Sequence, residues 1–107
     1  MANGVIIPKD LKGDWTVLVN TSTCVIAYKI DKYTVSVYLD YKATASDWTT
    51  AGTLPSDAKP FYTHYIPAYV DYSINGYKMY HIASDTGVIS VKGNTGSTPT
   101  IHVYPKG

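Results

Sequence analysis

Ring-bearing side chains are the residues of this sequence with the clearest chemical use. The chain has 107 residues, among them 11 tyrosines, two tryptophans and one phenylalanine. A core needs rings but has little use for so many phenolic hydroxyls, so many of the tyrosines must reach a wet surface or an interface. Rings that stack on sugar faces, with Asp, His and Tyr groups that hydrogen-bond sugar hydroxyls, suit saccharide binding. The candidate saccharide-binding residues are Trp48, Tyr62, His64, Asp71, Tyr80 and His81.

These candidates also have structural interpretations. Trp48 lies in a Thr- and Ser-rich stretch outside any predicted strand, where it either binds a ligand or plugs the core from a loop. His64 and His81 lie on predicted strands, where histidine is more often a structural residue than a ligand. Tyrosines on either side of Asn75-Gly76 can stack as cross-strand partners, which favours sheet stabilisation and subunit packing over a ligand platform. They are Tyr62, Tyr65, Tyr69, Tyr72, Tyr77 and Tyr80.

The residue pattern argues against catalysis, cofactors and metals. No Gly-x-Ser-x-Gly nucleophile motif occurs, and the aspartates that a two-carboxylate glycosidase would need have the positions of strand-end and turn residues. Three widely spaced histidines do not form a recognisable metal-binding motif. Cys24, the single cysteine, excludes an internal disulfide and is predicted to be a buried, inert thiol, with a catalytic cysteine as the alternative. We therefore expect no enzyme activity, no cofactor and no metal.

Charge and hydropathy exclude two further classes of partner. All nine basic residues are lysine and all eight acidic residues are aspartate, for a formal net charge of +1. Without arginine or a basic patch, nucleic acid is not an expected partner. No apolar run approaches the roughly 20 residues that span a bilayer, and the N-terminus lacks the pattern of a secretion signal. We expect a soluble chain without membrane insertion.

Short apolar runs separated by turn signals must position these side chains. Arg, Glu and Gln are absent, which disfavours helix, whereas abundant Val, Ile, Thr and Tyr favour strands. The pattern predicts an all-β fold of seven to eight short strands, a compact antiparallel β-sandwich or barrel. We expect one domain, residues 1–107, in which residues 1–14 could form an extended N-terminal arm. The predicted strands are Trp15 to Val19, Cys24 to Ile30, Tyr33 to Tyr41, Phe61 to Val70, Tyr77 to Ala83, Val88 to Val91 and Thr100 to Tyr104.

Alternation and turn residues add detail to this prediction. In residues 33–40 the odd-numbered side chains are predicted to face the core and the even-numbered ones solvent or a partner. Asp31-Lys32 predicts a tight hairpin turn, and Asn75-Gly76 predicts a second. Gly87 is expected in the left-handed conformation of a third turn, which makes the second half a β-meander. The segments 43–60 and 93–99 are predicted to be irregular.

Two segments resemble a known family. Gly52 to Pro60, with its Leu-Pro pair, short spacer, basic residue and proline, is similar to a segment in the C-terminal head domains of phage tail receptor-binding proteins and tail-fibre tips. Ile82 to Val91 is similar to the strand, glycine turn and β-branched strand that follow in the family. Asp57 stands where the family usually has Gly, and Lys59 where it has Arg. The resemblance implies a homotrimer in the virion, at the phage tail tip, that recognises saccharides of a bacterial cell envelope, with no catalytic residues to transfer.

Other interpretations remain beside the resemblance. Pro55 and Pro60 by themselves favour a stiff structural crossover from one sheet to the other. A structural virion component, in a baseplate or capsid decoration, would use the tyrosines for subunit contacts and bind no sugar. A stand-alone carbohydrate-binding or adhesin module would share the fold and could remain monomeric.

Overall fold

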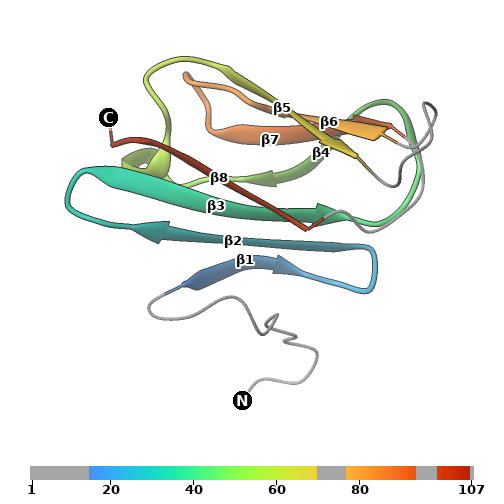
Figure 1. Ribbon diagram of the computed structural model, residues 1–107, viewed down its shortest axis with the longest axis horizontal. Helices are drawn as coiled ribbons and strands as arrows, with labels where there is room; N and C mark the ends of the chain where they lie inside the picture. The colour runs from blue at the N-terminus through green and yellow to red at the C-terminus, as the bar shows by residue number, and fades with distance from the viewer. Residues whose placement is uncertain (1–14, 70–76, 94–98, 107) are drawn as a thin grey trace.

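Two four-stranded antiparallel sheets pack face to face in the computed structural model of this protein, which describes residues 15–69, 77–93 and 99–106. Figure 1 shows the sheets as two layers. The first sheet has the order β1-β2-β3-β8, formed by β1 Thr16–Asn20, β2 Cys24–Ile30, β3 Thr34–Tyr41 and β8 Thr100–Pro105. The second has the order β4-β7-β6-β5, formed by β4 Ala45–Thr53, β7 Val88–Gly93, β6 Tyr77–Ile82 and β5 His64–Tyr69. The eight strands of the described residues confirm the all-β prediction and make the fold a sandwich.

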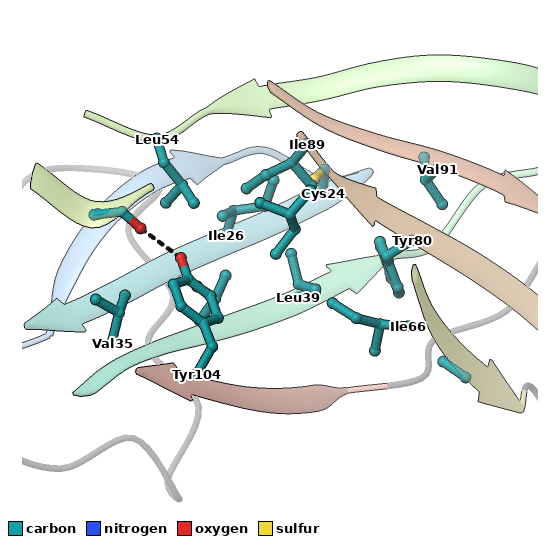
Figure 2. Packing of buried hydrophobic residues seen from close by; sticks show 14 of the residues in the cluster. Cys24, Ile26, Val35, Leu39, Leu54, Ile66, Tyr80, Ile89, Val91 and Tyr104 are labelled. Atoms are coloured by element: carbon teal, nitrogen blue, oxygen red, sulfur yellow. Dashed lines mark hydrogen bonds between the residues drawn. The ribbon is translucent and has the colours of Figure 1, made fainter. Parts of the chain in front are cut away.

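Apolar side chains of both sheets fill the space between them. Ile26 and Leu39 of the first sheet, and Ile82 and Val91 of the second, have no exposed area. Figure 2 shows such side chains pointing toward one another from the two layers. Since burying one of them contributes about 1.5–3 kcal/mol, contact between the sheets is the main source of stability.

The alternation predicted for residues 33–40 is confirmed on one face of β3 only. Val35, Val37 and Leu39 are buried between the sheets. The prediction that Tyr33 faces the core is wrong. Its side chain is 72% exposed because it lies in the turn before β3 begins.

The other face of β3 is buried as well, contrary to prediction. Tyr38 forms a second apolar cluster with Val25 and Ala27, and Trp15 packs against it. Ser36 and Asp40 are buried on the same face. Because β3 is an interior strand flanked by β2 and β8, neighbouring side chains cover its outward residues on both sides.

The β4 strand corrects the prediction that residues 43–60 are irregular. It pairs with β7 through Thr49 to Val91 and Thr50 to Ser90, with register shifts along its length. Residues 46–50 are all exposed, so burial does not alternate along this edge strand. Its sequence correspondingly shows no alternation of apolar and polar residues. Threonine nevertheless suits a pleated strand, and pairing with β7 orders the segment.

The predicted hairpins are confirmed as pairings. The β2 and β3 strands pair, but their connection is one residue longer than predicted because β3 starts at Thr34. The β5 and β6 strands pair from His64 with Ile82 to Tyr69 with Tyr77, while the Asn75-Gly76 turn itself lies outside the described residues. The meander holds for β5, β6 and β7, but β8 crosses to the first sheet beside β3.

The segment from Gly52 to Pro60 connects the two edge strands of one sheet. It leaves β4 and reaches β5, so the predicted crossover between sheets is wrong. A 3-10 helix, η1 Ser56–Ala58, forms within it, and Leu54 and Ala58 are buried. The Tyr104 hydroxyl of β8 donates a hydrogen bond to the Ala58 carbonyl oxygen, drawn as a dashed line in Figure 2. The segment therefore closes one end of the sandwich.

Candidate functional site

Three ring-bearing side chains meet on the outward face of the second sheet. Tyr65 of β5 lies directly opposite His81 of β6, and His81 lies opposite Ser90 of β7. Thr50 of β4 continues this row, and Trp48 lies two residues before it. Residues two apart in a strand share a face, so register brings Trp48, Tyr65 and His81 together. We call these three residues the aromatic surface.

Ring contacts fix the geometry of the aromatic surface. The ring centroids of Tyr65 and His81 are 4.8 Å apart, and those of Trp48 and His81 are 5.7 Å apart. The ring centroids of Trp48 and Tyr65 are 6.3 Å apart, and the angle between the ring planes is 64°. Tilted and edge-to-face contacts of this kind are favourable for aromatic pairs. The rings therefore hold one another in place while their outer sides remain accessible.

The aromatic surface lines a shallow hollow. Trp48 is 45% exposed and Tyr65 is 62% exposed. With His81 and Ser90 they line a hollow of about 300 Å³. The apolar ring faces can stack on the C–H face of a sugar, while the Tyr65 and Ser90 hydroxyls and the His81 ring nitrogens can hydrogen-bond its hydroxyl groups. A saccharide could be held here without covalent chemistry.

Two of the six predicted site residues, Trp48 and His81, lie on the aromatic surface. Tyr65 was predicted only as a cross-strand partner; its position opposite His81 is the signal that adds it to the site. Tyr62 is 80% exposed on the bend before β5 but does not line the hollow. Asp71 lies outside the described residues.

The prediction that Tyr80 is a saccharide-binding residue is wrong, because the residue belongs to the core. It has no exposed area, and its hydroxyl oxygen accepts a hydrogen bond of 2.8 Å from the backbone N–H of Tyr41. Successive residues of a strand point to opposite faces, so Tyr80 and His81 cannot both face outward. Tyr80 joins the two sheets.

His64 is also separate from the aromatic surface. It pairs with the buried Ile82, so its side chain shares the inward face, at the edge of the sandwich. Its Nδ1 lies 3.1 Å from Nε2 of His102 on β8, where one imidazole N–H donates to the other ring. Tyr104 packs against both rings. His64 therefore takes a structural role, linking the edge strands of the two sheets.

The histidine pair makes stability sensitive to mild acid. Burial, and secondarily the charge of His64, lower the pKa of His102 below the ordinary value of 6.5. His102 therefore binds a proton more readily in the unfolded chain than in the folded one. The stability that the neutral His102 provides is complete above about pH 6.5 and is lost as the pH falls toward the pKa of His102 in the folded state. We expect unfolding free energies from urea titrations to decrease between pH 7.5 and 5, by at most about 1.4 kcal/mol per pH unit for one proton.

The variant His102→Gln isolates this effect. It should be less stable than the native chain at pH 7.5, because the inter-ring hydrogen bond is lost, but its stability should vary less with pH. If the unfolding free energy of His102→Gln decreased between pH 7.5 and 5 as much as that of the native chain, other groups would be the cause.

Buried polar groups elsewhere have structural roles. The thiol of Cys24 is buried as predicted, and burial, with a smaller contribution from Asp40, raises its pKa to about 11, so it stays protonated. Lys78, which the sequence reasoning did not single out, is fully buried, and burial lowers its pKa. Its Nζ donates to the Tyr41 carbonyl oxygen and lies 5.7 Å from the centroid of the Tyr41 ring.

Within residues 15–69, 77–93 and 99–106, no three or more His, Cys, Asp or Glu side chains are grouped so that they could hold a metal ion. In the same part of the chain, no helix has the length and apolar character needed to cross a membrane. No protein-family model matches the chain, and a search of curated proteins finds no significantly similar sequence.

Proposed function

We propose that this chain is the receptor-binding domain of a phage tail and recognises a saccharide of the bacterial cell envelope through the aromatic surface. The observation that carries the proposal is the pair of exposed rings, Trp48 and Tyr65, beside a hollow that they line together with His81 and Ser90. Packing of the core does not explain why these rings face solvent, and their apolar faces match the chemistry of sugar rings. The resemblance of Gly52 to Pro60 and Ile82 to Val91 to tail head domains supports the setting in a phage tail tip.

A second candidate is a structural virion component that binds no sugar. Ile101 and Val103 of β8 are large apolar residues exposed on the outward face of the first sheet, and they pair with Tyr38 and Ser36. Exposed apolar residues in a group favour protein contacts. The same face supports a homotrimer in the receptor-binding proposal, so the solution mass alone does not separate the two functions; a monomer would favour a stand-alone binding module.

Saccharide binding is tested by removing rings from the aromatic surface. On an array of bacterial envelope polysaccharides, Trp48→Ala and Tyr65→Ala should each bind roughly tenfold or more weakly than the native chain, because truncating a central aromatic contact costs over 1 kcal/mol. Their urea midpoints should stay close to native, since both side chains are exposed.

Tyr33→Ala is the matched control. Tyr33 is an exposed tyrosine between β2 and β3, outside the aromatic surface, and its loss should leave binding unchanged. Native-like affinity in both Trp48→Ala and Tyr65→Ala would remove the assignment of the site. A native chain that binds no polysaccharide on the array would favour the structural virion component.

A further inference from the structure

A second hollow adjoins the aromatic surface and shares Trp48 with it. Its volume is about 450 Å³, and its described lining residues are Thr44, Ala45, Ser46, Trp48, Met79, Lys92 and Gly93. Trp48 of β4 and Lys92 of β7 both line it, and these two strands are neighbours in the sheet. Both hollows have volumes at the lower end of the range of about 300–1,000 Å³ for ligand sites. A ligand that extends past Trp48 on both sides would contact both.

The described lining of the second hollow carries a positive charge. Lys92 is exposed on β7 and supplies the only ammonium group among the described residues that line the two hollows, and no aspartate is among them. Asp47 is adjacent to Trp48 in sequence, but its Oδ1 accepts a hydrogen bond of 2.8 Å from the backbone N–H of Trp48, and it does not line either hollow. Lys92 therefore adds a positive charge to the described lining of the two hollows, and no aspartate of that lining offsets it.

The other groups of the second hollow suit a sugar unit. Thr44 and Ser46 bring hydroxyls, while Met79, opposite Lys92 on β6, brings an apolar side chain. Trp48 lines both hollows, so its indole can contact two successive units of a saccharide chain.

We infer that the ligand is an acidic saccharide of at least two units, with one unit on the aromatic surface and a carboxylate or phosphate group beside Lys92. This inference rests on the proposed function, and names the chemical class of its ligand. The rings supply stacking that is independent of charge, whereas the Lys92 ammonium distinguishes an anionic unit from a neutral one. The two contributions can be removed separately.

The test uses acidic envelope polysaccharides and their neutral counterparts. Polymers with carboxylates are presented before and after chemical reduction of the carboxyl groups, and polymers with phosphates before and after removal of phosphate. The native chain should bind an acidic polymer about fivefold more tightly than its neutral form at low salt, and added salt should reduce this difference. A preference among the carboxylate polymers would identify the anionic group as a carboxylate, and a preference among the phosphate polymers would identify it as a phosphate.

Lys92→Gln should remove the preference for the acidic polymer and keep the affinity for the neutral one. Lys106→Gln is the matched control, because it removes a lysine that is also exposed, just after β8, and should keep the preference. Equal binding of acidic and neutral forms, with both lost in Trp48→Ala, would overturn the inference and leave the proposed function intact. No binding of the native chain to any polymer would overturn both, and a preference retained in Lys92→Gln would overturn the role of this lysine.

Discussion

Replacing Tyr80 with alanine is expected to lower the free energy of unfolding by about 3–5 kcal/mol, the range for removing a large aromatic side chain from a core. The residue is fully buried and contributes to the cluster between the two sheets. Its loss would leave a cavity in a closely packed interior and would orphan the Tyr41 backbone N–H. Urea denaturation followed by circular dichroism measures the change.

Two further variants divide the Tyr80 effect into its parts. Tyr80→Phe keeps the ring and should cost about 1–3 kcal/mol, because a buried N–H then lacks its acceptor. Tyr65→Ala removes a ring of the same type from the outward face of the neighbouring strand β5, one residue from Ile66, which pairs with Tyr80, and should change stability by no more than about 0.5 kcal/mol. Native-like stability of Tyr80→Ala would contradict the placement of this ring in the core.

The interior of the fold could be predicted from the sequence where local rules act. Alternation places Val35, Val37 and Leu39 on one face, and a glycine after Asp85-Thr86 marks a turn of the left-handed type. These signals depend on neighbours in the chain. What covers the outward face of β3 depends on the strands that lie beside it, so the burial of Tyr38 and Asp40 left no local signal.

The site could be predicted in part only, for the same reason. Residue type singled out Trp48 and His81, but β4 lacks alternation and pairs with β7, which is distant in sequence. Without this pairing, nothing in the sequence brings Trp48 to the same face as His81. Tyr80 and His81 are adjacent, and pleating alone requires one of them to point inward; the polar partner of Tyr80 on β3 shows which.

The two segments that carry the family resemblance contact each other in the fold. The Leu54 N–H donates to the Gly87 carbonyl oxygen at 2.9 Å, and Lys59 Nζ donates to the Asp85 carbonyl oxygen at 3.0 Å. The turn that ends at Gly87 therefore supports the segment that closes one end of the sandwich. A structural role for both segments follows from these bonds alone, whatever the ligand.

Gly87→Ala is expected to destabilise the domain by about 1–3 kcal/mol, because Gly87 has a φ of +76°, which side-chain-bearing residues rarely adopt. A Cβ atom there would also lie 2.8 Å from the Leu54 carbonyl oxygen, a backbone atom that cannot move without disturbing the closing segment. Gly52→Ala is the matched control: its Cβ would meet only side-chain ends, 3.1 Å from Val19 Cγ2, at a position without positive φ. Thermal and urea unfolding should rank Gly87→Ala well below Gly52→Ala, and equal stability of the two variants would show that the closing segment tolerates movement at this turn.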